Sequence, residues 1–159
     1  MDPKLQARSD AANELVVEIA AKFGRVRFRV TGASMMPSVW PDDIVEIRRC
    51  DPADLEPAQI VLYRRMGRLV VHRIIRVEPD FLVTRGDAVS DEDSPIRKAD
   101  VLGRVVRIQR RGRLLYPKRS RLLRTCSAIF RRSDFCLGMM LRVGRIVRQY
   151  RSKELSWSN

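Results

Sequence analysis

The sequence predicts a mainly β domain that follows a short helix and precedes a basic helical extension. Apolar and charged residues alternate in several short runs after residue 24, and glycine, proline or aspartate separates these runs. At both ends of the chain the period changes, and apolar residues recur every three or four positions. We therefore expect an N-terminal helix in residues 1–24, a β domain in residues 25–117 and a helical extension in residues 118–159.

The N-terminal helix is expected at residues 10–23, with Asp10 as its N-cap and Gly24 as its end. From Arg25 the period becomes two, and Val26, Phe28 and Val30 alternate with arginines, as in a strand with one solvated face. Further strands are expected at residues 44–47, 59–63, 69–77, 81–85 and 101–108. Strands of this length and spacing are typical of a β-rich domain.

The composition is that of a folded protein with an anionic partner. The chain has 159 residues, 45% of them hydrophobic and 32% charged, which is enough for one domain with a core. Its formal net charge is +13, and residues 118–153 contribute eleven lysines and arginines against the single acid Asp134. Such a charge favours an anionic membrane surface, nucleic acid or an acidic substrate.

The basic extension has three interpretations. Its apolar positions fall on one face and its arginines on the other, which is the pattern of a helix lying on an anionic membrane. The same pattern suits a helix that packs on its own domain with a solvated charged face. Nucleic-acid binding is the third, although the tail has no interleaved aromatic residues and no helix-turn-helix precedes the domain. We prefer peripheral membrane attachment.

The cysteines and the hydropathy of the chain indicate in which cellular compartment the protein is expected. The three cysteines are odd in number and lack metal-binding spacing, so neither a disulfide framework nor a zinc site is indicated. The first residues contain no apolar signal-peptide core, and the longest uncharged run in the tail, residues 135–141, is seven residues long. We therefore expect a cytoplasmic protein, or one peripheral at the membrane, without a signal peptide or a transmembrane helix.

Residues 31–37, Thr-Gly-Ala-Ser-Met-Met-Pro, are typical of a loop that presents a nucleophile, and we interpret Ser34 as that nucleophile. A serine hydroxyl needs a neighbouring base to accept its proton during attack on a carbonyl. The only histidine, His72, lies in an apolar, strand-like run and is the candidate base. The alternative is a structural histidine, partly buried on a strand.

A carboxylate that accepts the second ring N–H of the histidine would complete the arrangement. Asp87, Asp91 and Asp93 are candidates, because they lie in an acidic segment that follows the strand ending at Arg85. Alone, this segment equally suits a solvated turn.

Together these motifs resemble, in order, those of the signal-peptidase and LexA-type clan of serine peptidases. The resemblance covers roughly residues 28–107. The matching motifs are Val30-x-Gly32-x-Ser34-Met35-x-Pro37, Pro41-x-Asp43, His72-Arg73-Ile74 and Gly86-Asp87 followed by Asp93. In that clan the serine attacks the peptide carbonyl, and the base lies on a strand about forty residues later; here the interval is 38 residues.

The histidine resembles the base of the endoplasmic-reticulum and archaeal signal peptidases, whereas most bacterial signal peptidases and LexA-like proteins use lysine. By position, the resemblance implies that Asp93 orients His72 and that Asp87 supports it, while Asp91 matches less well. It also implies that the backbone N–H of Ser34 belongs to the oxyanion hole. The chain has Gly32 where signal peptidases usually carry serine and Asp42 where they usually carry glycine. Signal peptidases also have transmembrane anchors, which this sequence does not predict.

The sequence thus predicts a serine endopeptidase that processes a precursor protein or peptide and needs no metal or organic cofactor. One alternative is a LexA-like regulator that cleaves itself, although neither Ala-Gly nor Cys-Gly, the dipeptides cut in that group, precedes Ser34. The other is a catalytically silent module that retains the groove and binds peptides.

Overall fold

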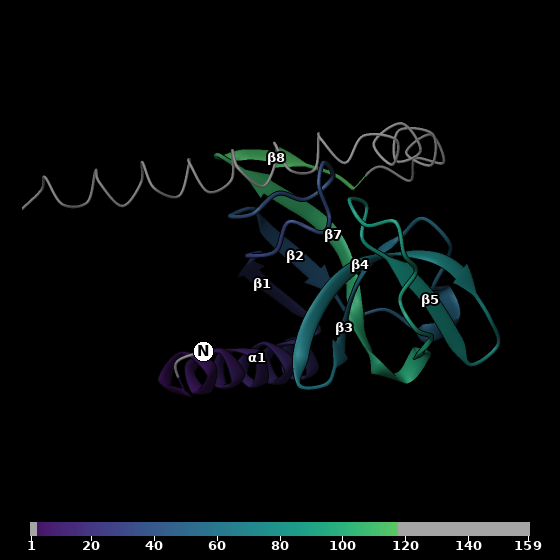
Figure 1. The fold of residues 1–159 in the computed structure, drawn as a ribbon, viewed down its shortest axis with the longest axis horizontal. Helices are drawn as coiled ribbons and strands as arrows, with labels where there is room; N and C mark the ends of the chain where they lie inside the picture. The colour runs from purple at the N-terminus through teal and green to yellow at the C-terminus, as the bar shows by residue number, and fades with distance from the viewer. Residues whose placement is uncertain (1–2, 118–159) are drawn as a thin grey trace, which may run out of the picture. The chain divides into compact units, whose positions relative to one another are not determined.

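The computed structural model describes residues 3–117, with side chains from residue 11 onward (Figure 1). Residues 1–2 and 118–159 lie outside the described part. The predicted helicity of the basic extension, and its expected contact with a membrane, therefore concern residues that the structure does not describe.

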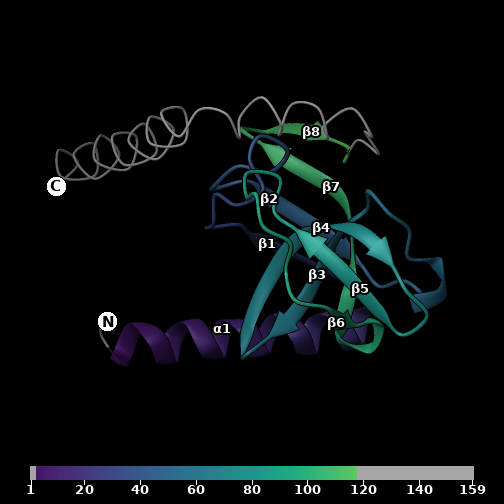
Figure 2. The same ribbon diagram turned by 45° about the vertical axis from the view of Figure 1, so that its right-hand side comes forward.

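Residues 3–117 form one helix and eight strands, and the helix packs at one end of the sheet against β1, β4 and β7 (Figures 1 and 2). The elements are α1 (Pro3–Phe23), β1 (Arg25–Arg29), β2 (Ile44–Arg48), β3 (Ile60–Arg65), β4 (Arg68–Val77), β5 (Phe81–Arg85), β6 (Ile96–Arg97), β7 (Val101–Arg110) and β8 (Arg113–Leu115), with short 3₁₀ turns at Pro52–Asp54 and Lys98–Asp100. The expectation of a mainly β domain after one N-terminal helix is confirmed.

All strand pairs are antiparallel, in the order β1-β2-β7-β3-β4-β5-β6, with β8 paired to β7. The long strand β7 returns from the end of the domain and inserts between β2 and β3. It thereby joins the β1–β2 hairpin to the β3–β6 meander. This insertion brings the loop after β1 close to strands that are distant in sequence.

Helix α1 is longer than predicted. It begins at Pro3, so Asp10 lies inside the helix and the predicted N-cap at this residue is wrong. Proline suits the first helical turn, because its missing N–H has no acceptor there in any case. The predicted end is confirmed: Gly24 has φ +65°, and its N–H donates to the carbonyl of Ala20 at 3.0 Å.

The six predicted strands are present, and two short ones were missed. Strand β6 has only two residues, too few to show a period. All three residues of β8 are exposed, so no apolar alternation marks it. Strand β6 is held by pairing with β5, and β8 pairs with the end of β7 across a two-residue turn at Arg111 and Gly112.

Strand β3 separates two apolar clusters. Ile60 and Leu62 pack in one cluster with the β1–β2 hairpin and α1, whereas Val61 and Tyr63 pack in the other with β4, β5 and β6. Four consecutive residues of β3 are buried because the strand is covered on both faces. Within residues 3–117, no helix is long and apolar enough to cross a bilayer.

Candidate active site

The loop that carries Ser34 connects β1 to β2 and is closed at its base by two backbone hydrogen bonds. Val30 donates to Asp43 at 2.9 Å, and Asp42 donates to Val30 at 2.8 Å. Asp42 has φ +72°, a left-handed conformation that glycine adopts freely and aspartate tolerates.

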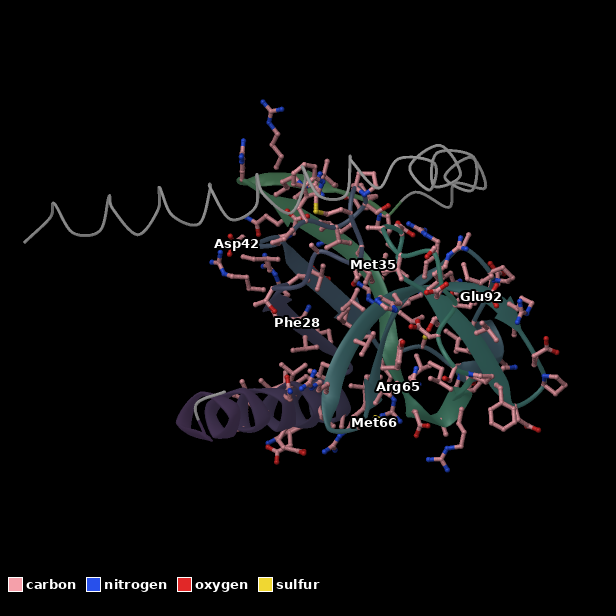
Figure 3. The ribbon with its side chains drawn as sticks, in the orientation of Figure 1. Phe28, Met35, Asp42, Arg65, Met66 and Glu92 are labelled. Carbon is pink, nitrogen blue, oxygen red and sulfur yellow. The ribbon has the colours of Figure 1, made fainter. Side chains whose placement is uncertain are left out.

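Inside the loop, Met35 acts as the anchor. It is 1% exposed and packs in the apolar cluster with residues of β1 and β2 (Met35 is labelled in Figure 3). Met35 is therefore a core residue, whereas Met36 is only half-buried. Burial of Met35 fixes its neighbour Ser34 at the surface of the core, where the hydroxyl can meet a partner.

His72 lies on β4 opposite Val61 of β3. Its Nε2 is 3.0 Å from the Oγ of Ser34, and its Nδ1 is 2.6 Å from the Oδ2 of Asp93. The imidazole therefore bridges the hydroxyl and the carboxylate, one ring nitrogen to each. The His72 and Asp93 side chains are 13% and 20% exposed, so water has limited access to their hydrogen bond.

Of the three candidate aspartates, the structure brings only Asp93 to the histidine. Asp91 is exposed, and no hydrogen bond joins its side chain to the described residues. Asp87 is held by Arg73, the residue after His72: its two oxygens accept from Nε and Nη2 of Arg73, each at 2.7 Å. Successive strand residues point to opposite faces, so an aspartate on the Arg73 face does not support His72 directly.

The Arg73 guanidinium joins the two loops of the site. Besides binding Asp87, it donates from Nη2 to the Oγ of Ser38 at 3.0 Å and from Nη1 to the carbonyl of Ala58 at 2.8 Å. Ser38 belongs to the loop that carries Ser34, and Asp87 belongs to the loop after β5. Arg73 and Asp87, with side chains 8% and 9% exposed, form a nearly buried ion pair that fixes both loops to β4.

A second arginine holds the Ser34 loop from β7. Arg110 donates to both oxygens of Asp43, and its Nη2 also donates to the carbonyl of Ser38 at 3.0 Å. Asp43 is 2% exposed and also accepts from the backbone N–H of Trp40 at 2.8 Å. The guanidinium lies 5.4 Å from the centroid of the Trp40 ring, a cation–π distance, so Trp40 covers this ion pair.

The Ser34 loop also contacts the loop after β5 through backbone atoms. The carbonyl of Ser34 accepts from the N–H of Ala88 at 2.8 Å. A Cβ on Gly86 would lie 2.6 Å from the same oxygen, closer than real Cβ atoms approach backbone oxygen. Position 86 therefore requires glycine for this close approach.

Behind Asp93 lie two buried hydroxyls. The Thr84 Oγ1 is 2.7 Å and the Tyr63 Oη 3.2 Å from Oδ2 of Asp93, and the two hydroxyls are 3.1 Å apart. Burial raises the pKa of Tyr63 to about 12. The hydrogen bond with Thr84 lowers this pKa, and the negative charge of Asp93 raises it further. The phenol therefore keeps its proton at neutral pH and can donate it.

Sequence reasoning found Ser34, His72 and Asp93 but assigned no role to four side chains around them: Tyr63, Thr84, Arg73 and Arg110. The first two look like ordinary strand residues, and the arginines are two among many in a basic chain. The Arg73 position within the His72-Arg73-Ile74 motif was the only available signal. No cluster of three or more potential metal ligands occurs among the described residues.

The arrangement has the chemical parts for nucleophilic acyl transfer. A hydroxyl, a base within hydrogen-bond reach and a carboxylate that orients the base are in contact in that order. Within the described residues, no backbone hydrogen bond engages the Ser34 N–H.

No protein-family model matches the chain, and no curated protein is similar enough to count as a match. The functional assignment therefore depends on the residues and their geometry.

Proposed function

We propose that this protein is a serine endopeptidase of the signal-peptidase type that hydrolyses a peptide bond in a precursor protein or peptide. The observation that carries the proposal is the contact of His72 with Ser34 at 3.0 Å through one ring nitrogen and with Asp93 at 2.6 Å through the other. A structural histidine needs neither an adjacent serine hydroxyl nor a carboxylate on its far side. Both together are what a serine nucleophile requires.

In the proposed reaction, Oγ of Ser34 attacks the carbonyl carbon of the substrate while Nε2 of His72 accepts the hydroxyl proton. The imidazolium that forms is stabilised by Asp93, to which Nδ1–H donates. Collapse of the tetrahedral intermediate breaks the C–N bond, and His72 gives the proton to the departing amine. Water then attacks the acyl-enzyme, loses a proton to His72 and releases the carboxylate product as Ser34 regains its hydrogen.

The backbone N–H of Ser34 is the proposed oxyanion donor. A donor held in place before the reaction contributes more than one that must reorganise, because the cost of orienting it is not incurred at the transition state. The Ser34 loop is held by Arg73 and Arg110 through Ser38, and by Ala88 through the Ser34 carbonyl. These contacts support a donor that is fixed before substrate binds.

Two further observations favour the signal-peptidase and LexA type over other serine hydrolases. The order of the motifs along the chain matches that clan, and the structure is mainly β. An α/β-hydrolase fold, with alternating helices and a mainly parallel sheet, would present its serine at a sharp strand-to-helix turn instead. Here the serine follows β1 of an antiparallel sheet and precedes β2.

We further propose that the basic segment, residues 118–153, attaches the enzyme peripherally to an anionic membrane. Near such a surface each lysine or arginine is worth about 1 kcal/mol, so a few engaged residues suffice to concentrate the enzyme there. Nucleic acid is the less favoured partner.

Covalent labelling tests the proposed activity. The full-length protein is incubated with a fluorophosphonate, which forms a bond from phosphorus to an activated serine oxygen and releases fluoride. We expect one adduct by intact mass, located on Ser34 by peptide mapping. The adduct is absent from Ser34→Ala and strongly reduced in His72→Ala.

The matched control is Ser90→Ala, since Ser90 is an exposed serine outside the contacts described above. It should label as the parent does. A folded parent that stays unlabelled would overturn the proposal in favour of a catalytically silent peptide-binding module.

A further inference from the structure

We propose that Tyr63 and Thr84 are positioning residues, which hold the Asp93 carboxylate against His72 and so fix the tautomer of the imidazole. The inference rests on the proposed function, since it assigns two further residues to the same reaction. The inference is based on three side chains that contact the same oxygen of Asp93. Oδ2 of Asp93 lies 2.6 Å from Nδ1 of His72, 2.7 Å from Oγ1 of Thr84 and 3.2 Å from Oη of Tyr63.

The sheet register brings these groups to one face. Val61 pairs with His72, and Tyr63, two residues on, pairs with Val70, so Tyr63 and His72 project from the same side of β3 and β4. Ile74, two residues after His72, pairs with Thr84 of β5, which places the threonine on that side as well. The Tyr63 and His72 rings meet edge to face, with centroids 6.5 Å apart.

Asp93 is bound by its backbone to the same strand. Its N–H donates to the carbonyl of Thr84 at 2.8 Å, so one residue holds both the main chain and the side chain of Asp93. The carboxylate is nevertheless 20% exposed and lies in a loop. Without further donors, its side chain could rotate toward water and leave His72.

Hydrogen counting supports donation toward the carboxylate. An ionised carboxylate only accepts, and each hydroxyl has one hydrogen to donate. Thr84 can give its hydrogen to Oδ2 at 2.7 Å, and Tyr63 can give its own to the same oxygen at 3.2 Å. Tyr63 and Thr84 are both 0% exposed, so neither hydroxyl has water as an alternative partner.

The consequence concerns the proton on His72. Neutral imidazole carries its hydrogen on one of two nitrogens, and only the form with Nδ1–H leaves Nε2 free to accept from Ser34. A carboxylate held at Nδ1 selects that form. If Asp93 rotates away, the Nε2–H form gains population, and this form donates to Ser34 instead of accepting its proton.

The experiment measures the tautomer directly, because His72 is the only histidine in the chain. The full-length protein is labelled with ¹⁵N-histidine, and the two ring-nitrogen shifts are recorded over a rising pH series and compared at its alkaline plateau, where they no longer change. The same samples are assayed for the rate of fluorophosphonate labelling at Ser34. The variants are Thr84→Val, which keeps the shape and removes the hydroxyl, and Tyr63→Phe, which removes only the phenol oxygen.

We expect the parent to show Nδ1–H almost entirely. Thr84→Val should shift population to Nε2–H and slow labelling roughly tenfold or more, the change that about 1.4 kcal/mol at the transition state produces. Tyr63→Phe should act in the same direction but by less, because its contact is longer. Thr84→Ser restores a hydroxyl and should recover the parent tautomer and most of the rate.

The control variant is Tyr116→Phe, which removes the hydroxyl of an exposed tyrosine and should change neither readout. Circular dichroism confirms that each variant is folded. The inference would be overturned if Thr84→Val and Tyr63→Phe both kept the His72 tautomer and the Ser34 labelling rate of the parent. The two hydroxyls would then have a purely structural role.

The two proposals can fail separately. If the parent does not label but the tautomer shifts in Thr84→Val, the peptidase proposal fails and the positioning network stands. If the parent labels and the tautomer is unaffected by either variant, the peptidase proposal stands and the network does not.

Discussion

The Arg73 guanidinium and the Asp87 carboxylate form a two-bond ion pair, with both N–O distances 2.7 Å and both side chains less than a tenth exposed. The pair lies on the opposite face of β4 from His72, yet it joins the two loops that supply Ser34 and Asp93. Asp87 therefore supports the site through Arg73 and Ser38.

Removing Asp87 should destabilise the protein strongly. In Asp87→Ala the nearly buried Arg73 guanidinium loses the opposite charge and the two hydrogen bonds of Asp87, which costs about 3–5 kcal/mol. Urea denaturation measures the change. The comparison is Glu92→Ala, which breaks the more exposed pair with Arg76 and should cost less than about 1 kcal/mol. Equal effects in the two variants would contradict a structural role for the Arg73–Asp87 pair.

Asp93→Asn should abolish most activity and leave the fold intact. The amide is nearly isosteric but can donate a hydrogen to Nδ1, which selects the wrong tautomer of His72; the equivalent change in the well-studied serine proteases lowers kcat by about 10⁴. We expect a loss of this order in the rate of Ser34 labelling. Asp91→Asn, at an exposed aspartate two residues away, should label at the parent rate. A large loss in Asp91→Asn instead would make Asp91 the orienting carboxylate.

Gly86→Ala should displace the Ser34 loop. The new methyl group would lie 2.6 Å from the Ser34 carbonyl oxygen, and this backbone atom cannot move without breaking its hydrogen bond from Ala88. We expect a loss of about 1–3 kcal/mol, as for other overpacked sites, and slower labelling of Ser34. Gly32→Ala, where a Cβ meets nothing within 4 Å, is the stability control. Unchanged stability in both variants would show that the two loops do not approach so closely.

Stability should fall with alkaline pH through Tyr63. Its pKa is raised from 10 in the unfolded chain to about 12 in the folded protein, mainly by burial. Between these values the unfolded chain loses the phenol proton and the folded protein keeps it, so the free energy of unfolding falls as pH rises. The full loss is roughly 2–3 kcal/mol, complete above the folded pKa.

Guanidinium denaturation from pH 9 to 12 measures this fall, and Tyr63→Phe should flatten it. Tyr116→Phe, at an exposed residue, should follow the parent. A parent-like slope in Tyr63→Phe would exclude Tyr63 as its source.

The full chain should bind vesicles that contain phosphatidylserine and not vesicles of phosphatidylcholine alone. Binding depends on charge, so it should weaken as salt rises, since the Debye length shortens from about 10 Å at 0.1 M to about 3 Å at 1 M. Co-sedimentation measures the bound fraction. Replacing Arg142, Arg145 and Arg148 by glutamine should reduce it. No binding to either vesicle, with retention of short DNA duplexes, would favour the nucleic-acid interpretation of the tail.

Much of the fold was predictable because local pattern reports how a strand is exposed. Strand β1 alternates because only one of its faces is covered. Strand β3 is a continuous apolar run because both of its faces are covered. The start of α1 was missed although Pro3, a residue suited to the first helical turn, is visible in the sequence. Strands β6 and β8 were missed because two or three residues are too few to show a period, and β8 has no buried face.

The sequence by itself determined which chemistry is available: one histidine, a serine in a loop between strands and a short acidic segment after a strand. The pattern of residues alone did not determine which aspartate contacts the histidine. Asp87, Asp91 and Asp93 lie in one short segment, and the path of the chain through this segment decides which carboxylate faces His72. The tertiary structure decided this, placing Asp93 at His72 and Asp87 at Arg73. The physical reason is strand geometry: neighbouring residues of β4 point to opposite faces, and only the sheet register specifies what each one meets.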